Sequence, residues 1–431
     1  MKQRFACLQA ALERPPAGTR GLVLAFSGGL DSTALLHALV ESAPALPVRA
    51  IHVCHHLQPD AQRWAADCAR RAAAWNVAYT RVDIHVATAG RGLEAAAREA
   101  RYEALCAALE SDETLITAHH ARDQAETFLL QALRGAGPQG LAGMPHSARL
   151  GEHRHWRPWL DIDHDTIAAY AEAQGLQWID DPSNHDSAIA RSFLRESIMP
   201  QLRRRWPQAD RLLARSAAHA QEAAAAIDTL AAIDLEQALA QDDALETHVL
   251  DGLGPARAKQ VVRRWLVQAG HDRPDHRHVA QIIELGASRL VASPVVAFAD
   301  TEVRLFDGRL YAMARLPAVR ADFEQRWDGR TPLSLPAGCG TLALAPAPRV
   351  GLALTVALRR GGERVPARSG GHRRVKDVLR EARLPPWLRE RIPLVYRDDT
   401  LIAIGDLWRH PHIHQLTASE IGAFIWHKSR P

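Results

Sequence analysis

The sequence contains few cysteines, and their arrangement excludes several classes of protein. Only five cysteines occur among 431 residues, and no two of them form a C-x-x-C pair. This argues against a disulfide framework and favours a reducing compartment. No apolar run approaches the roughly 18 residues of a membrane span, and the short apolar stretch 5–12 is interrupted by Gln9. We therefore expect a soluble, cytoplasmic protein with no membrane partner.

The sequence also lacks a strong excess of charge of either sign. It has 53 basic and 49 acidic residues, and only four of the basic residues are lysines. Hydrophobic residues make up 47% of the chain, which excludes a wholly disordered protein. The small positive excess is unevenly distributed along the chain. Residues 351–431 include fifteen basic and eight acidic residues, and residues 189–215 include seven basic and two acidic residues. Both regions suit a long polyanion, and a solvated basic surface is the alternative interpretation.

Strand and helix patterns alternate over the first two hundred residues. Apolar strand-like runs and helical patterns follow one another at 22–26, 33–40, 48–53, 60–75, 77–84, 93–109 and 114–118. This alternation predicts βαβ units and a doubly wound parallel sheet, which binds ligands beyond the carboxyl ends of its strands. We expect an α/β protein with a catalytic parallel-sheet domain at 1–215 and a mainly helical middle domain with short strands at 216–315. A boundary segment rich in proline and glycine at 316–340 precedes a small basic α+β domain at 341–431.

The loop after the first predicted strand carries the strongest functional signal. It reads Ser27-Gly28-Gly29-Leu30-Asp31-Ser32. Paired glycines let an anion approach the backbone, whose N–H groups point at it where a helix begins. Asp31 suits a Mg²⁺ ion that bridges phosphate oxygens. The lysine of a Walker A motif is absent, which argues against an ordinary P-loop kinase or GTPase.

Other interpretations of glycine-rich segments stay open at this point. The stretch 25–29 is similar to a nucleophile elbow, which would make Ser27 an acyl-transfer nucleophile, but no H-G-G-G-type segment accompanies it. A glycine-rich turn without a ligand is the simpler alternative. The stretch 135–140 matches G-x-G-x-x-G, but it follows a helical pattern and contains Pro138, so we reject it as a dinucleotide fingerprint.

Motifs spread over nearly the whole chain resemble one family. The loop at 27–32 resembles the pyrophosphate-binding loop of the PP-loop ATP pyrophosphatase superfamily. Further motifs resemble the tRNA(Ile)-lysidine synthetases within it; they occupy 50–53, 93–98, 101–102, 118–128, 134–144, 178–184, 358–364, 384–389 and 393–396. The string from Ala118 to Met144 is the most specific. The resemblance implies a ligase that uses ATP and Mg²⁺ and releases AMP and pyrophosphate.

The same resemblance implies the reaction and its partners. ATP adenylates the C2 oxygen of the wobble cytidine in the isoleucine tRNA that carries a CAU anticodon. Free L-lysine then displaces AMP through its ε-amino group, which gives lysidine and lets the tRNA read AUA. The expected partners are this tRNA, free L-lysine and a second copy of the chain in a homodimer.

Candidate residues for the amino acid follow strand 114–118. Asp123 and Glu126 are three residues apart at the start of a helix, so both face one side at the nucleotide edge of the sheet. The pair can bind an ammonium group or share a metal ion, and a solvated acidic helix terminus is the alternative. His119 is the candidate for proton transfer. No metal site is assigned to Cys54, His55 and His56, whose consecutive spacing does not suit tetrahedral ligation.

Arginines supply the candidate tRNA contacts. We expect phosphate contacts from Arg191, Arg195, Arg203, Arg204, Arg205, Arg359, Arg360, Arg364, Arg373, Arg374 and Arg389. Trp387 lies among the last group and is expected to stack on a base. At Arg122 the sequence departs from the family, which usually has Asp there.

Two other kinds of enzyme are alternatives to the lysine ligase. One is another PP-loop enzyme, such as a tRNA thiolase, which typically needs paired cysteines, or an amidotransferase, which needs a glutaminase module. The other, remote alternative is a serine hydrolase acting through Ser27.

Overall fold

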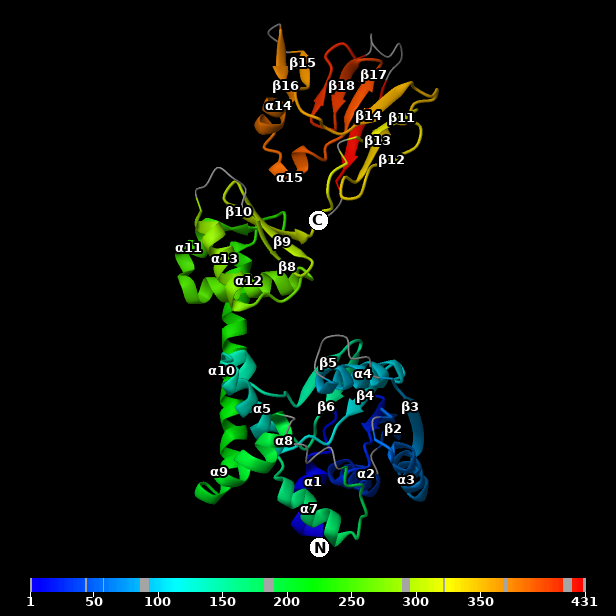
Figure 1. Cartoon of the computed structure of the whole chain (residues 1–431), viewed down its shortest axis with the longest axis vertical. Coiled ribbons are helices and arrows are strands. Elements are labelled where there is room, and N and C mark those ends of the chain that lie inside the picture. The colour runs from blue at the N-terminus through cyan, green and yellow to red at the C-terminus, as the bar shows by residue number, and fades with distance from the viewer. Residues whose placement is uncertain are drawn as a thin grey trace. The chain divides into compact units, whose positions relative to one another are not determined.

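The computed structural model describes residues 2–42, 45–56, 58–85, 93–181, 190–288, 295–320, 322–366, 371–413 and 421–428. The chain divides within the long helix α10 (Ala209–Ala238) into two compact units, Met1–Ala226 and Ile227–Pro431 (Figure 1). None of the helices in the described ranges combines the length and the apolar character that crossing a bilayer requires. Each unit has its own hydrophobic core and is described separately.

The first unit is built on a six-stranded sheet in the order β3-β2-β1-β4-β6-β5. Its strands are β1 (Gly21–Ala25), β2 (Val48–Cys54), β3 (Ala78–Asp83), β4 (Glu113–Ile116), β5 (Ser147–Leu150) and β6 (His153–Trp156). All neighbouring strands are parallel except β5 and β6, which form an antiparallel hairpin at one edge. The predicted parallel sheet is confirmed, whereas the sequence patterns did not reveal the hairpin.

Helices cover both faces of this sheet, as a doubly wound fold requires. Leu22 and Leu24 of β1 pack in one core with α2 (Leu30–Ser42) and α7 (His164–Ala173), whereas Val23 packs on the other face with α4 (Leu93–Ala107). Figure 1 shows the sheet between α2 and α4. The remaining helical segments of the unit are η1 (Lys2–Phe5), α1 (Ala6–Ala10), α3 (Ala61–Ala74), α5 (Ala121–Leu133), α6 (Pro138–Leu141), α8 (Ala190–Phe193), the π-helical η3 (Leu194–Ile198) and α9 (Met199–Arg205).

The second unit begins with a mainly helical part, as predicted. Helices α11 (Thr247–Leu253), α12 (Pro255–Gln268) and α13 (His276–Ala287) pack with α10 around one core. A small sheet in the order β7-β10-β9-β8 completes it, with β7 (Leu245–Glu246), β8 (Val295–Phe298), β9 (Thr301–Phe306) and β10 (Arg309–Ala314). A two-residue turn joins β9 to β10, and both Asp307 and Gly308 have positive φ, as such a hairpin loop favours.

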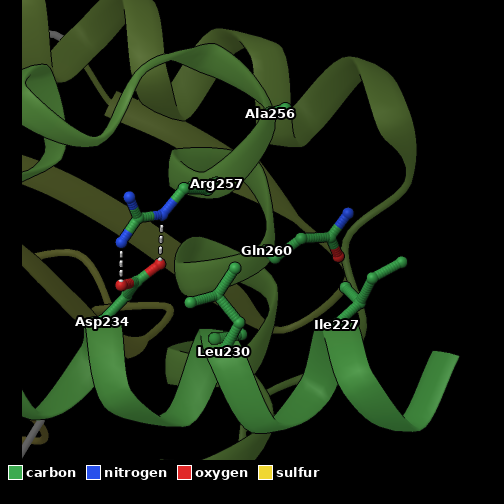
Figure 2. A pocket seen from close by; sticks show the side chains of 7 residues that line it. Ile227, Leu230, Asp234, Ala256, Arg257 and Gln260 are labelled. Carbon is green, nitrogen blue, oxygen red and sulfur yellow. Dashed lines mark hydrogen bonds and ion pairs between the residues drawn. The ribbon is translucent and has the colours of Figure 1, made fainter. Parts of the chain in front are cut away.

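A pocket between α10 and α12 contains one ion pair. Arg257 donates through Nε to Asp234 Oδ2 at 2.9 Å, and Asp234 is fully buried. Figure 2 shows Ile227 and Leu230 beside this pair, so the rest of the lining from α10 is apolar. Because both charges are satisfied within the pocket, the contact stabilises the packing of α12 on α10.

The C-terminal part contains mostly antiparallel strands with two short helices. A five-stranded sheet has the order β11-β14-β17-β18-β19, and a three-stranded sheet has the order β12-β13-β20. The elements are β11 (Glu324–Trp327), β12 (Leu333–Ser334), β13 (Thr341–Ala345), β14 (Leu354–Ala357), β15 (Arg364–Pro366), β16 (His372–Arg374), α14 (Val375–Glu381), α15 (Pro386–Arg389), β17 (Leu394–Arg397), β18 (Thr400–Ile404), β19 (Trp408–Arg409) and β20 (Ala423–His427). The segment 316–340, expected as a boundary, contains β11 and β12, and Trp327 and Leu333 belong to the C-terminal core. Its prolines and glycines occur in turns between short strands. Amino-acid composition alone does not distinguish such turns from a linker between domains.

Candidate active site

The loop Ser27–Ser32 joins β1 to α2 at the carboxyl edge of the parallel sheet. Gly28 has φ +82°, and a Cβ atom there would lie 2.6 Å from Cys68 Sγ and 2.7 Å from Ile179 Cδ1. Only glycine meets both the backbone and the steric requirement at this position. A Cβ atom on Gly29 would have no contact closer than 3.6 Å, so neighbouring atoms do not crowd the loop at this position.

Hydrogen bonds hold the loop in one conformation. The carbonyl oxygen of Gly28 accepts from the backbone N–H of Ile179 at 2.9 Å, from Thr33 Oγ1 at 3.1 Å and from Arg71 Nη1 at 3.1 Å. The hydroxyls of Ser27 and Ser32 lie 3.0 Å apart. No imidazole hydrogen-bonds Ser27 within the part of the chain that the structure describes, so the loop has no hydrolase-like base.

Asp31 lies in the first turn of α2 and faces two histidines. Its Oδ2 is 3.6 Å from His120 Nε2, and its Oδ1 is 3.4 Å from Nε2 of His164, the first residue of α7. Burial lowers the pKa of His164 to about 4, although Asp31 opposes the shift. Burial also disfavours the charged form of His120, but Asp123 and Asp31 outweigh it and raise the pKa of this imidazole.

The carboxylate of Asp31 fits a Mg²⁺ ion that arrives with a triphosphate. Mg²⁺ prefers oxygen ligands and is commonly held by one or two carboxylates together with phosphate oxygens and water. Asp31 Oδ1 is buried and has no hydrogen-bond partner among the described residues. It therefore offers one free oxygen ligand at the end of the loop.

Asp123 and Glu126 lie in the first turns of α5 and point toward the same guanidinium group. Arg195 of η3 donates through Nε to Glu126 Oε1 and through Nη2 to Glu126 Oε2, both at 2.8 Å, and its Nη2 is 3.3 Å from Asp123 Oδ1. Arg191 donates to Thr127 Oγ1 at 2.6 Å, and its Nε is 3.5 Å from Glu126 Oε2. The two arginines thus contact the carboxylate pair, which differs from the expected position on an open tRNA-binding surface.

The electrostatics keep this site ionised. Burial opposes the charge of Asp123, but His120, His119, Arg191 and Arg195 outweigh it and lower the pKa of the carboxyl. Burial likewise opposes the charge of Arg195, yet its hydrogen bond to Glu126 raises the pKa of the guanidinium. The site therefore presents fixed groups of both signs side by side.

His119 lies next to this pair but begins a different hydrogen-bonded chain. Its Nδ1 is 2.7 Å from Thr117 Oγ1, which is 2.8 Å from His155 Nε2, and Arg157 Nη2 lies 3.0 Å from His155 Nδ1. Burial lowers the pKa of His119 to about 3. The imidazole is therefore neutral near pH 7 and only weakly basic there.

The other predicted arginines divide into paired and free groups. Arg203 binds Asp210, whereas Arg204 and Arg205 are exposed beside the exposed Trp206. In the C-terminal part, pairing or backbone contacts engage Arg359, Arg360, Arg373 and Arg389. Arg364 and Arg374 are exposed and stand directly opposite each other across β15 and β16. Like charges in this position are unfavourable unless an anion lies nearby.

The expectation that Trp387 stacks on a base is wrong. Its ring is buried, lies 5.5 Å from the ring of Tyr311 and 6.0 Å from that of Phe306, and faces the guanidinium of Arg304. Trp387 therefore packs the C-terminal part against the middle part of the second unit. Sequence alone did not distinguish this aromatic from an exposed one.

Comparisons with known proteins agree with this architecture. Three family models match the chain: a PP-loop domain at residues 2–202, a TilS substrate binding domain at 245–311 and a TilS substrate C-terminal domain at 354–424. The tRNA(Ile)-lysidine synthase of Alkalilimnicola ehrlichii is 41% identical over 404 residues, which cover 90% of this chain and 89% of that protein. The corresponding protein of Edwardsiella ictaluri is 39% identical over 422 residues, with 95% of each chain covered. This chain belongs to the tRNA(Ile)-lysidine synthase family.

In this member of the tRNA(Ile)-lysidine synthase family, the structure brings together residues that motif reading did not assign to the site. His164 reaches Asp31 from α7, and Arg195 reaches Glu126 from η3. Neither residue stands in a motif whose spacing indicates the contact. The sequence marked Arg195 only as part of the basic stretch 189–215, and from that stretch we predicted a contact with tRNA. Residues 182–184 of the motif 178–184 lie outside the described residues.

Proposed function

We propose that this chain ligates free L-lysine onto C2 of the wobble cytidine of the CAU-anticodon isoleucine tRNA. The C2 oxygen attacks the α-phosphorus of ATP and pyrophosphate leaves; the ε-amino nitrogen of lysine then attacks C2 and AMP leaves. Membership of the lysidine synthase family across nearly the whole chain supports the reaction. The observation that carries the assignment of the site is the pair Asp123 and Glu126, held at the same sheet edge as the phosphate loop.

The loop and its neighbours account for the adenylation half of the reaction. The backbone N–H of Gly28 donates to Ser32 Oγ at 3.1 Å and that of Gly29 to Ser27 Oγ at 3.4 Å, and the leaving pyrophosphate would take over these donors. Asp31 would hold Mg²⁺. When bound, this ion neutralises charge on the triphosphate.

The carboxylate pair accounts for lysine binding. A free amino acid carries an ammonium and a carboxylate on the same carbon, so its site needs groups of both signs. Asp123 and Glu126 bind the ammonium, and the neighbouring Arg191 and Arg195 bind the carboxylate. Burial lowers the pKa of His119 to about 3, so this imidazole is too weak a base to take the proton of the attacking amine near pH 7.

A single assay tests the proposed function. The full chain is incubated with ATP, labelled lysine and the CAU-anticodon isoleucine tRNA, and label in tRNA is measured together with AMP and pyrophosphate. We expect one lysine incorporated for each AMP released, with no label incorporated when either ATP or tRNA is omitted. Incorporation without tRNA, or none at all, would contradict the proposal.

Arg364 and Arg374 of the C-terminal hairpin, which have no ion-pair partner among the residues that the structure describes, supply a second prediction. We expect the double variant Arg364→Gln and Arg374→Gln to bind tRNA more weakly, because each side chain neutralises one phosphate. The slope of log K against log salt should fall by about 2. Filter binding at several salt concentrations measures both quantities. The matched control is Arg373→Gln. Arg373 is next to Arg374 in β16 but pairs with Glu381 at 2.6 Å, so this variant should keep the original slope.

A further inference from the structure

Three side chains from separate elements meet beside the phosphate loop. Asp31 comes from the first turn of α2, His120 directly precedes α5, and His164 begins α7. One ligand atom from each of them lies within 4.8 Å of the other two. Both imidazoles turn Nε2 toward Asp31, at 3.6 Å for His120 and 3.4 Å for His164.

This cluster is partly buried, and part of its hydrogen-bonding capacity is unused. His120 is 3% exposed, so the imidazole that faces Asp31 is removed from solvent. Asp31 Oδ1 is buried without a hydrogen-bond partner among the residues that the structure describes. A buried carboxylate oxygen that accepts no hydrogen bond is costly unless a cation reaches it, and His164 Nε2 lies 3.4 Å from this one.

The donor set indicates which cation suits the site. Imidazole nitrogen is a good ligand for Zn²⁺, Cu²⁺, Fe²⁺ and Ni²⁺, whereas Mg²⁺ prefers oxygen alone. Two histidines and one carboxylate with open positions form a recurrent site for such ions. Ligand atoms around tetrahedral Zn²⁺ are separated by about 3.3 Å. The separations of His120 Nε2 from Asp31 Oδ2 and of His164 Nε2 from Asp31 Oδ1 are both close to that value.

We propose that Asp31, His120 and His164 bind one divalent first-row transition metal ion in the free protein, more tightly than they bind Mg²⁺. The ion takes the carboxylate of Asp31, whose two oxygens each face one imidazole, and the Nε2 atoms of His120 and His164. The proposal that an ion binds here is argued from the geometry of the three side chains alone. Only the identity of the outer ligand, a phosphate oxygen of ATP, rests on the proposed function.

A second group of potential ligands serves as an internal comparison. Cys54, His56 and Asp83 also bring their ligand atoms within 4.8 Å of one another. Here the carboxylate is already satisfied, because Asp83 Oδ1 accepts from Arg81 Nη2 at 2.6 Å and lies 2.7 Å from His56 Nε2. A guanidinium at this distance competes with any cation, so this second group is not expected to bind the ion.

The test measures ion binding without ATP, lysine or tRNA. The full chain is stripped with a chelator and titrated with Co²⁺, followed by visible absorption, and with Mn²⁺, followed by electron paramagnetic resonance. We expect one equivalent to bind, and millimolar Mg²⁺ should not displace it. His164→Ala and Asp31→Asn should each weaken binding about tenfold or more, whereas His56→Ala should leave it unchanged.

Several outcomes would overturn the proposal. These are no bound ion in the wild-type chain, equal affinity in His164→Ala, or a loss confined to His56→Ala. If His164→Ala lowers the melting temperature, His164→Asn, which retains a polar side chain, is measured in its place. Because no substrate is present, a failure here is independent of the lysine-incorporation assay, and a failure of that assay leaves the ion-binding result standing.

Discussion

Replacing Glu126 with glutamine is expected to lower kcat/KM for lysine by about 100-fold while changing ATP affinity by less than about threefold. The substitution keeps the shape of the side chain but removes a fully buried charge that contacts both Arg195 and Arg191. Loss of a charge-assisted contact to the amino acid costs about 3 kcal/mol, which corresponds to the 100-fold change. Steady-state lysine incorporation and equilibrium ATP binding measure the two effects separately.

Glu113→Gln is the matched control for this prediction. Glu113 forms a largely buried, two-point pair with Arg49 at the amino end of β4, away from the loop. Both variants lose one buried carboxylate charge beside an arginine, so both should be less stable. Only Glu126→Gln should impair the use of lysine. Equal lysine kinetics in the two variants, or an equal loss of ATP affinity in Glu126→Gln, would contradict the assignment of the pair to lysine.

Replacing Gly28 with alanine is expected to abolish most ATP binding, with a loss of about 100-fold or more. The new Cβ atom would overlap Cys68 Sγ and Ile179 Cδ1, so the loop must move away from its present path. The left-handed backbone costs about 1–2 kcal/mol, and the overlap adds about 1–3 kcal/mol. A displaced loop no longer directs its N–H groups at a phosphate. Isothermal titration with ATP and thermal unfolding measure the two effects.

Gly135→Ala separates the backbone strain from the steric overlap. Gly135 has φ +70°, close to that of Gly28, but a Cβ atom there meets nothing within 4 Å. This variant should lose about 1–2 kcal/mol of stability and retain its ATP affinity. If Gly28→Ala bound ATP as the wild type does, the proposed role of the loop would be wrong.

Much of the fold of the first domain could be predicted from local sequence patterns, because its strands, turns and helix starts depend on residues that are close in the sequence. The run 22–26 precedes two glycines and a helix, and that order alone predicts a strand, an anion-binding loop and a helix N-terminus. Asp123 and Glu126 were predicted together because helical spacing puts residues three apart on one side. Both predictions needed only neighbours in the sequence.

Contacts between distant segments could not be read in this way. Arg195 meets Glu126, and His164 meets Asp31, only after separate helices pack together. An arginine in a basic stretch predicts a nucleic acid contact from sequence alone. The prediction is the same when the arginine in fact pairs with a buried carboxylate of another helix. The burial of Trp387 and the exposure of Arg364 also depend on tertiary packing. Arginine and proline occur close to both residues in the sequence, so the neighbourhood does not separate the buried residue from the exposed one.

The carbonyl group of Gly28 has a consequence for the thermodynamics of nucleotide binding. Three donors from separate segments, Ile179, Thr33 and Arg71, already hold it before any ligand is present. The ordering of the loop therefore occurs during folding, and little conformational entropy remains to be lost when a triphosphate binds. A mutation that loosens any of these three contacts would weaken ATP binding without touching ATP.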